Sequence, residues 1–307
     1  MTDTKKILVI GAGAVGGFYG AKLTLSGEDV TFLARGKTLQ ALQTQPLKIK
    51  SFQGDFETRV TAIDSLEGFK TPDLIIIAVK CYDTDFILKQ IEPIVGPDTR
   101  LLSLQNGVEN EIKMKAAFGE KRTLGGVCYI GSETLEPGLI LHNANGSIAI
   151  GELGGEITSS IQTFESLFQK AGIDVMVSDN IWRNLWIKLG RNASFNQVCT
   201  IARTDVGHVL DHPELLELIK KTYLEVFAVA KGHGVDIDES VIDMSLLFSQ
   251  NDLRSVRPSM LQDFENHRPL EHESFSGFLS REGKSLNIPT PINDTFYDFL
   301  SFLNYGK

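Results

Sequence analysis

The sequence predicts an α/β fold in which an N-terminal, doubly wound and mostly parallel sheet precedes a second, all-helical C-terminal domain. Short aliphatic runs alternate with amphipathic stretches through the first half of the chain, which is the order of βαβ units. A glycine-rich segment directly follows the first run. Strand signals mostly vanish after Ser178, so we place the boundary near Val177–Asn180 and expect domains of residues 1–178 and 179–307.

Apolar runs in the first half predict the strands of the sheet. Leu74–Val79 is aliphatic at every position, as expected of a strand buried on both faces. Amphipathic spacing predicts helices at Val15–Leu25 and Ser159–Ala171. The runs predicted to be strands are Ile7–Ile10, Val30–Leu33, Leu74–Val79, Arg100–Leu104 and Asp174–Val177.

The pattern changes between Arg122 and Ile150. Two pairs of turn residues, Pro137-Gly138 and Asn145-Gly146, divide this segment. The expected strands are Thr123–Ile130, Leu139–Asn143 and Ser147–Ile150. Short strands joined by such turns predict an antiparallel or mixed extension of the sheet.

Helix-forming stretches fill the second half. The predicted helices are Asn180–Gln197, Pro213–Gly232, Ser240–Gln250, Met260–Gly283 and Asp294–Leu303. The phenylalanines Phe296, Phe299 and Phe302 predict core packing of the last helix, with a homodimer interface as the alternative.

Composition narrows the class of protein. The net charge of −9 comes without a block of like charges, which argues against nucleic acid or an anionic membrane surface as the main partner. Cys81, Cys128 and Cys199 are scattered, so we expect neither a disulfide framework nor a zinc site, and a cytoplasmic location fits. No apolar run approaches the roughly 20 residues of a membrane helix.

The glycine-rich segment is a dinucleotide-binding motif in the right context. It follows a strand and opens a helix, as the G-x-G-x-x-G fingerprint of a Rossmann-type domain requires. The first glycine permits a tight turn, the second lets the backbone approach a pyrophosphate, and the third allows close packing of helix and strand. The motif residues are Gly11, Ala12, Gly13, Ala14, Val15 and Gly16. A glycine-rich turn without a nucleotide is the alternative.

The end of the second strand predicts NADP(H) as the cofactor. An acidic residue there would favour NAD by binding the ribose 2′-hydroxyl, but the sequence has Arg35 followed by Lys37. A guanidinium pairs well with a 2′-phosphate. A solvated loop arginine is the alternative.

Polar side chains also follow two other predicted strands. Lys80 comes after Leu74–Val79, and Asn106 follows Leu101–Leu104. Because ligands of open α/β sheets bind outside the carboxyl ends of the strands, Lys80 is a candidate for the cofactor and Asn106 for the nicotinamide side or the substrate. Taken alone, a lysine or an Asn-Gly pair in a loop is more often a solvated residue than a functional one.

One helix of the second half carries a polar stripe, which we define as Lys188, Asn192 and Asn196. The spacing of i, i+4 and i+8 places these residues on one side of a helix. A solvent-exposed face is the simple alternative. Asparagine is a mediocre helix former, however, so two of them beside a lysine suit a wall of hydrogen-bonding groups better than a solubility face.

With these residues in view, the chain resembles the ketopantoate reductase family (2-dehydropantoate 2-reductase) over nearly its whole length. The resemblance implies an NADPH-dependent reduction of ketopantoate to pantoate, a step toward pantothenate and coenzyme A. The segments that carry it are Gly11–Gly16, Ala78-Val79-Lys80, Gln105-Asn106-Gly107, Leu185–Asn196 and Pro258–Asp263, leading to Glu271 and Gly277-Phe278.

The resemblance also implies roles for the matching residues. Lys188 matches the general acid that protonates the carbonyl oxygen, and Glu271 matches an acidic residue that closes on the nicotinamide ribose and the substrate. Residues that match substrate contacts are Asn106, Asn192, Asn196 and Ser259, of which Asn106 also contacts the cofactor. Cofactor contacts match the glycine motif, Arg35, Lys80 and the backbone of Ile130.

Two questions stay open at this point. Glu273 competes with Glu271 for the carboxylate role; we favour Glu271 because its offset from Ser259 matches the family, and Pro269 predicts a break or kink in the helix there. The substrate is expected between the carboxyl edge of the sheet and the helical domain. Alternatives to a ketopantoate reductase are a dehydrogenase of another 2-keto or 3-hydroxy acid, a non-catalytic NADPH-binding regulator, and a purely structural α/β protein.

Overall fold

The computed structural model describes residues 4–305, and the chain divides into two compact units. The first, here the sheet unit, extends to Gln105 and resumes from Asn110 to Ile181. The second, the helical unit, comprises Trp182 onward together with the short loop Asn106–Glu109. The division predicted at residues 178 and 179 assigns this loop to the N-terminal domain, whereas here it packs with the helical unit.

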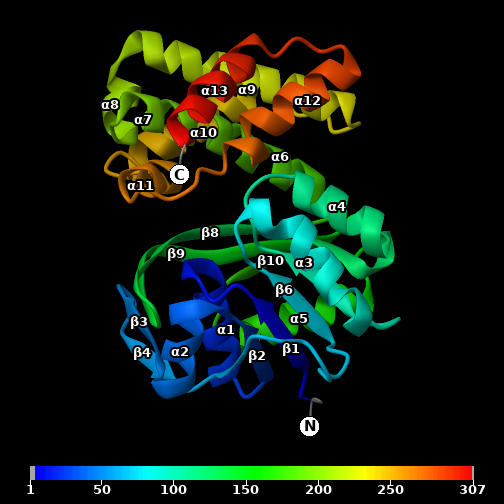
Figure 1. Cartoon of the computed structure of the whole chain (residues 1–307). Coiled ribbons are helices and arrows are strands. Elements are labelled where there is room, and N and C mark those ends of the chain that lie inside the picture. The colour runs from blue at the N-terminus through cyan, green and yellow to red at the C-terminus, as the bar shows by residue number, and fades with distance from the viewer. Residues whose placement is uncertain (1–3, 306–307) are drawn as a thin grey trace. The chain divides into compact units, whose positions relative to one another are not determined.

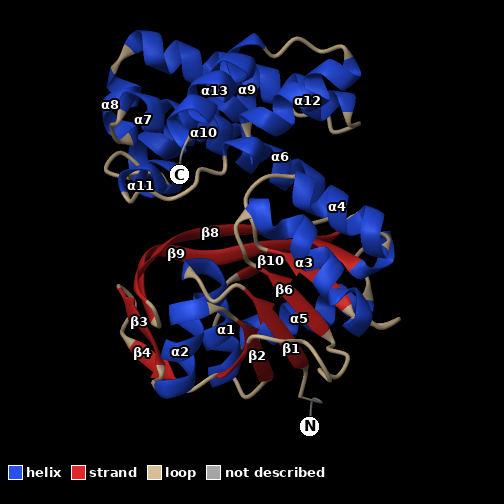
Figure 2. Ribbon diagram, in the orientation of Figure 1, coloured by secondary structure: helices blue, strands red, loops and turns tan. Residues whose placement is uncertain are grey.

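The sheet unit contains one mixed sheet of ten strands (Figures 1 and 2). Its order is β4-β3-β9-β8-β7-β6-β1-β2-β5, with β10 paired to β9. All described pairings are parallel except β8 with β9 and β3 with β4, which confirms the mostly parallel, doubly wound sheet. The strands are β1 (Lys6–Ile10), β2 (Asp29–Leu33), β3 (Leu47–Ser51), β4 (Phe56–Thr58), β5 (Thr61–Ile63), β6 (Leu74–Ile77), β7 (Arg100–Ser103), β8 (Thr123–Glu136), β9 (Leu139–Glu152) and β10 (Val175–Val177).

Both faces of the central strands are buried. In β1, Ile7 and Val9 join one apolar cluster, while Leu8 and Ile10 join another. Helices α1 (Ala14–Leu25) and α5 (Ser159–Lys170) contribute to the first cluster, and α3 (Thr84–Ile91) and α4 (Glu109–Phe118) to the second. Since successive side chains of a strand point to opposite faces, this double burial explains why the strand is apolar at every position.

The hairpin of β8 and β9 corrects one prediction. Leu139–Asn143 and Ser147–Ile150 are parts of a single strand, and Asn145-Gly146 is not a turn between two strands. Gly146 is an extra residue opposite the step from Tyr129 to Ile130, so the pair forms a β-bulge. Asn145 and Gly146 have φ of 54° and 122°, a backbone region that these two residue types tolerate.

The helical unit is built around α9 (Pro213–Gly232), which the sequence predicted at the same bounds. This helix packs against α8, α12 and α13 and against the segment Asn192–Asn196. The other helices are α6 (Ile181–Arg191), α7 (Gln197–Ala202), α8 (Val206–Asp211), α10 (Ser240–Asp252), α11 (Ser259–Glu265), α12 (Ser276–Leu286) and α13 (Pro291–Asn304). Within residues 4–305, strands occur only in the sheet unit (Figure 2).

Two predicted helices are interrupted. Met260–Gly283 is not one helix: α11 ends at Glu265, a single turn spans His272–Ser274, and α12 begins at Ser276. Pro269, which lacks a backbone N–H, lies in the break, as expected from its chemistry. The predicted helix Asn180–Gln197 is continuous only to Arg191, after which five residues form a π-helical turn.

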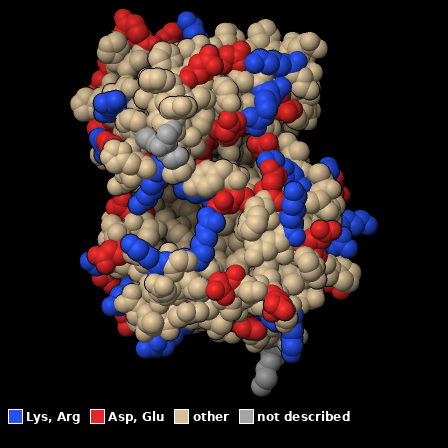
Figure 3. All heavy atoms as spheres, viewed as in Figure 1, with Lys and Arg blue, Asp and Glu red and all other residues tan. Residues whose placement is uncertain are grey.

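Charged residues of both signs are mixed on the surface. Figure 3 shows Lys and Arg interspersed with Asp and Glu on the visible face. Phe296 is buried, whereas Phe299 and Phe302 are exposed, so core packing explains only the first of the three phenylalanines. No helix within residues 4–305 combines the length and the apolar composition needed to cross a membrane.

Candidate active site

The glycine motif lies in the sheet unit, between the carboxyl end of β1 and the start of α1. Gly11 has a φ of 98°, and a Cβ there would lie 2.7 Å from the carbonyl oxygen of Ala78. A Cβ on Gly16 would lie 2.0 Å from the carbonyl oxygen of Gly11. Both positions therefore require glycine for close packing of the turn, as the fingerprint predicts.

The second glycine of the motif leaves room for a ligand. Gly13 is the N-cap of α1; no side chain caps this helix end, and its first turn holds no acidic residue. A Cβ on Gly13 would meet nothing within 4 Å. Ala12, Ala14 and Val15 pack against the apolar cluster, so the motif offers its backbone. An open, uncapped helix N-terminus fits the pyrophosphate of a dinucleotide.

The predicted cofactor selector pairs with a carboxylate. Arg35, exposed at the start of α2 (Gly36–Thr44), donates from Nη2 to Asp83 Oδ2 at 2.8 Å. Asp83 belongs to the short turn Cys81–Asp83, and its backbone N–H donates to the carbonyl of Lys80 at 2.9 Å. The carboxylate and Lys80 thus share one turn. Lys37 is exposed, and Ile130 lies at the bulge opposite Asn145.

In the helical unit, the predicted substrate residues form one chain of hydrogen bonds. Asn192 Nδ2 donates to Asn106 Oδ1, Asn196 Nδ2 donates to Asn192 Oδ1, and Ser259 Oγ donates to Asn196 Oδ1, each at 3.3 Å. The backbone N–H of Met260 donates to the same Asn196 oxygen at 3.1 Å. Asn192 and Asn196 are buried. Four predicted residues from three distant segments therefore meet in one network.

A single backbone group sets which amide atoms donate and which accept along this series of hydrogen bonds. The N–H of Met260 can only donate, so the Asn196 amide must turn its oxygen toward Met260 and its nitrogen toward Asn192. The same logic passes through Asn192 to Asn106, whose Oδ1 is the acceptor. The opposite side of the Asn106 amide is then its NH₂ group, which can donate to a ligand oxygen.

The π-helical turn Asn192–Asn196 places two buried asparagines within a helical segment. Carbonyl groups in and beside the turn gain side-chain partners: Ser194 donates to the carbonyl of Gly190, Gln197 to that of Ala193 and Thr200 to that of Asn196. π-helical turns inside α-helices often occur at functional sites. Lys188, half-buried in α6, precedes the turn by four residues and so lies on the same side of the helix as Asn192.

Glu271 and Glu273 lie in different surroundings. Glu271 is 7% exposed, and its neighbours on both sides are fixed to α13: Leu270 N donates to Asn304 Oδ1 at 2.8 Å, and His272 Nε2 lies 3.2 Å from Ser301 Oγ. Burial lowers the pKa of His272. The Glu271 backbone is thus held in place from both sides.

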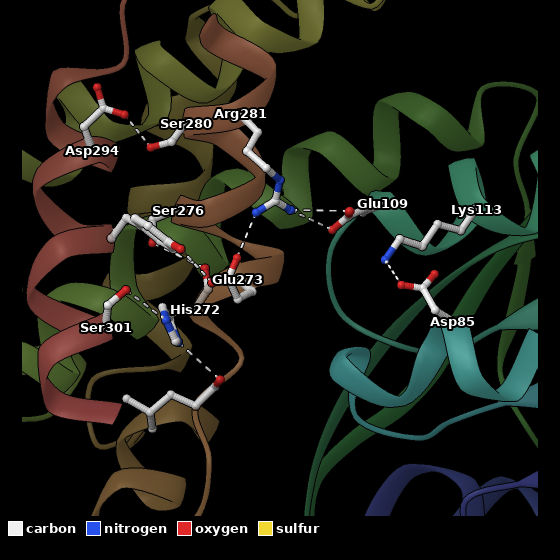
Figure 4. A network of polar contacts seen from close by, with 12 residues as sticks. Asp85, Glu109, Lys113, His272, Glu273, Ser276, Ser280, Arg281, Asp294 and Ser301 are labelled. Atoms are coloured by element: carbon white, nitrogen blue, oxygen red, sulfur yellow. Dashed lines mark hydrogen bonds and ion pairs between the residues drawn. The ribbon is translucent and has the colours of Figure 1, made fainter. Parts of the chain in front are cut away.

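Glu273 is engaged by two other side chains. Its Oε2 accepts from Arg281 Nη1 at 2.8 Å (Figure 4). Its Oε1 accepts from the Tyr297 hydroxyl at 2.8 Å. Accepting this bond, the Glu273 carboxylate raises the pKa of Tyr297. Both oxygens of Glu273 therefore have partners within the helical unit.

Several residues of these networks were not predicted. Asp83, Arg281, Glu109, Tyr297 and the backbone N–H of Met260 carry no local sequence pattern that reports their contacts. Arg281 and Glu109, for example, are 172 residues apart in the chain. Gly277-Phe278 is the one segment of the resemblance near these contacts, since Gly277 lies beside the ion pair of Arg281 and Glu273.

Comparisons with known proteins identify the family of the chain. The family model described as ketopantoate reductase PanE/ApbA matches residues 7–155, and the model of its C-terminal part matches residues 180–304. A 2-dehydropantoate 2-reductase from Pyrococcus horikoshii is 31% identical over 288 residues, covering 94% of this chain and 94% of that protein.

Solved structures show the same fold. The crystal structure of 2-dehydropantoate 2-reductase from Geobacter metallireducens matches with a TM-score of 0.90 at 32% identity, covering 97% of this chain and 99% of that one. D-mandelate dehydrogenase, in a ternary structure with NADH and anilino(oxo)acetate, matches with a TM-score of 0.91 at 23% identity, covering 97% and 98%. At that identity the second likeness shows the fold alone. The chain belongs to the ketopantoate reductase PanE/ApbA family and is an oxidoreductase of that family.

Proposed function

We propose that the protein is a cytoplasmic, NADPH-dependent 2-dehydropantoate 2-reductase, which forms pantoate on the route to pantothenate and coenzyme A. The observation that carries this proposal is the chain of amides from Asn196 through Asn192 to Asn106, which lies on the side of the helix that also carries Lys188. The family membership and the relatives named 2-dehydropantoate 2-reductase support the substrate.

The residues of the sheet unit would hold the cofactor. The N-terminus of α1, open at Gly13, would bind the pyrophosphate through backbone N–H groups. Arg35, Lys37 and Lys80 would supply positive charge for the 2′-phosphate. When bound, the reduced nicotinamide supplies the hydride that reduces the carbonyl carbon.

The residues of the helical unit would bind and protonate the keto acid. Negative charge grows on the carbonyl oxygen as the carbon is reduced, and the Lys188 ammonium would both stabilise this charge and donate the proton. The NH₂ group of Asn106 would donate to the substrate, with Asn192, Asn196 and Ser259 completing the wall. Glu271, a buried carboxylate, would accept hydrogen bonds from hydroxyl groups of the substrate or the cofactor ribose.

The test is an NADPH oxidation assay with 2-dehydropantoate beside pyruvate and 2-ketoisovalerate. We expect 2-dehydropantoate to give the highest kcat/KM. Lys188→Ala should lower kcat by about 10²–10⁴-fold with the Kd of NADPH unchanged, since an acid–base group is lost. Lys231→Ala, which removes an exposed lysine of the same unit, is the control.

Other results of these assays would favour the alternative functions. Preference for another 2-keto acid, or for oxidation of a 3-hydroxy acid, would assign a different substrate to the same machinery. NADPH binding without turnover of any acid would indicate a regulator. Full activity of Lys188→Ala would remove this lysine from the mechanism. Sedimentation of wild type beside Phe302→Ser tests a homodimer that covers the exposed end of α13.

A further inference from the structure

Arg281 joins two segments of the helical unit that are distant in sequence (Figure 4). Its Nη2 donates to Glu109 at 3.3 Å (Oε2) and 3.4 Å (Oε1), and its Nη1 donates to Glu273 Oε2 at 2.8 Å. Glu109 ends the loop that begins at Asn106, and Glu273 lies two residues after Glu271. One guanidinium therefore spans the segments that carry two candidate active-site residues.

Both carboxylates are themselves fixed. The Tyr297 hydroxyl on α13 donates to the second oxygen of Glu273 at 2.8 Å. The loop that ends at Glu109 is held at its other end, where Asn106 accepts from Asn192. Arg281 thus connects α13 and the His272–Ser274 turn, through α12, to the Asn106–Glu109 loop.

The ion pair packs directly against the backbone of α12. A Cβ on Gly277 would lie 2.7 Å from Glu273 Oε2, 3.1 Å from the Tyr297 ring and 3.2 Å from Arg281 Nη1. A larger residue at Gly277 would therefore require these side chains to shift.

We propose that Arg281 is a positioning residue that sets the distance between Asn106 and Glu271 by clamping Glu109 and Glu273. The inference rests on the proposed function for the roles of Asn106 and Glu271, but the clamp itself is a property of the helical unit. Half of the Arg281 side chain is exposed, so the pair contributes little to stability, and positioning is its main effect. Lysine, with a single ammonium, cannot serve both carboxylates in this way.

The first experiment compares Arg281→Ala and Arg281→Lys with Arg254→Ala, the control, which breaks the ion pair of Arg254 with Asp211 elsewhere in the helical unit. We expect Arg281→Ala to lower kcat/KM for the keto acid by about 10- to 100-fold, because small displacements of binding groups have effects of this size. Its Tm should fall by no more than about 3 °C, the Kd of NADPH should not change, and Arg281→Lys should restore only part of the activity. Activity of Arg281→Ala within two-fold of wild type would overturn the proposal.

A second variant separates positioning from long-range charge. If Arg281 acts only by attracting an anionic substrate, Glu109→Ala should lower the KM of the keto acid, since it removes a negative charge. If Arg281 acts as a clamp, Glu109→Ala should raise KM and lower kcat, and its effect should not add to that of Arg281→Ala. A lower KM in Glu109→Ala would contradict the clamp.

A third measurement does not depend on the substrate. Hydrogen–deuterium exchange of the backbone amides reports local opening directly. We expect Arg281→Ala to speed exchange in both 106–109 and 271–274, and Arg254→Ala in neither. If the wild type reduces no keto acid, the proposed function is wrong, but hydrogen exchange still tests whether Arg281 holds the two segments. Unchanged exchange in both segments would refute the clamp, whatever the substrate is.

Discussion

Arg35 donates to Asp83 at 2.8 Å, so the arginine expected to read a 2′-phosphate already faces a carboxylate within the sheet unit. Both groups lie near the surface, where such a pair contributes about 1 kcal/mol or less. A phosphate carries more negative charge than a carboxylate and would compete well for the guanidinium. We therefore expect Asp83 to moderate, rather than block, the recognition of a 2′-phosphate by Arg35.

This relationship predicts the cofactor preference of two variants. Asp83→Asn should lower the Kd of NADPH by about five-fold, the equivalent of 1 kcal/mol, and leave the Kd of NADH unchanged. Arg35→Asp should raise the Kd of NADPH and weaken the preference over NADH. Fluorescence titration with both cofactors measures these values, and Asp85→Asn, whose carboxylate pairs with Lys113, is the control. Equal use of NADPH and NADH by the wild type would contradict the selector role of Arg35.

A second prediction tests the polarity of the amide chain. Asn196→Asp keeps the acceptor for Met260 N–H but replaces the donor to Asn192 by an oxygen. The Asn192 and Asn106 amides would each have to rotate, and Asn106 would then present an oxygen to the substrate carboxylate. We expect the KM of the keto acid to rise at least about ten-fold, the effect of about 1.4 kcal/mol from a lost hydrogen bond.

The control for this variant is Asn196→Ala. It should destabilise the protein by about 1–3 kcal/mol through the unsatisfied partners, but it does not force the reversal. If Asn196→Asp had a lower KM than Asn196→Ala, the polarity argument would be wrong.

The glycine motif yields a third prediction, on two positions with opposite surroundings. Gly13→Ala adds a Cβ that meets nothing in the protein, so Tm should change little, while the Kd of NADPH should rise by about ten-fold or more because the methyl group occupies the approach to the helix N-terminus. Gly11→Ala should instead destabilise the fold by more than about 1–2 kcal/mol, given its φ of 98° and the close Ala78 carbonyl. Thermal melts with and without NADPH separate the two effects. Tight NADPH binding by Gly13→Ala would place the pyrophosphate elsewhere.

A fourth prediction concerns acid stability. Burial lowers the pKa of His142, which lies between Phe18 and Phe52, and also that of His272. The unfolded chain therefore binds more protons than the folded chain just below the ordinary imidazole pKa of about 6.5. The stabilisation is complete above that value, and the free energy of unfolding should fall as the pH drops from there toward the lowered pKa values of the folded protein.

Urea unfolding at several pH values between about 5 and 8 measures this slope. His142→Gln should flatten it, because the substitution removes one buried imidazole. His208→Gln, which removes an exposed imidazole, is the control. A slope that is the same in wild type and His142→Gln would assign the acid sensitivity to other groups.

Much of the sheet unit could be predicted because strands that are buried on both faces have aliphatic residues at every position. The aliphatic runs Leu74–Val79 and Ile7–Ile10 predicted β6 and β1, although β6 ends at Ile77. The short strands β3 to β5 and helices α2 to α4 escaped prediction because their sequences mix polar with apolar residues and part of each is exposed. The turn predicted at Asn145-Gly146 was wrong, since the same pair of residues suits both a tight turn and a β-bulge.

The residues of the candidate site could also be predicted only in part. Residues on one helix, such as Lys188 and Asn192, could be related by spacing alone. Their partners from elsewhere could not, because the bonds to Asn106 and Ser259 depend on which chain segments the fold brings together. The contacts of Arg281 show this most clearly: nothing within its own helix indicates that Glu109 lies beside it.

The π-helical turn at Asn192–Asn196 takes up one residue more than the α-helical turn it replaces. Each residue of an α-helix rotates the following side chains by about 100°, so eight residues of regular α-helix would leave Asn196 about 80° around the axis from Lys188. The wide turn, with more residues per turn, brings Asn196 back toward the side of the helix that carries Lys188. The alignment of these two side chains therefore depends on the helix geometry between them as well as on the identity of the residues.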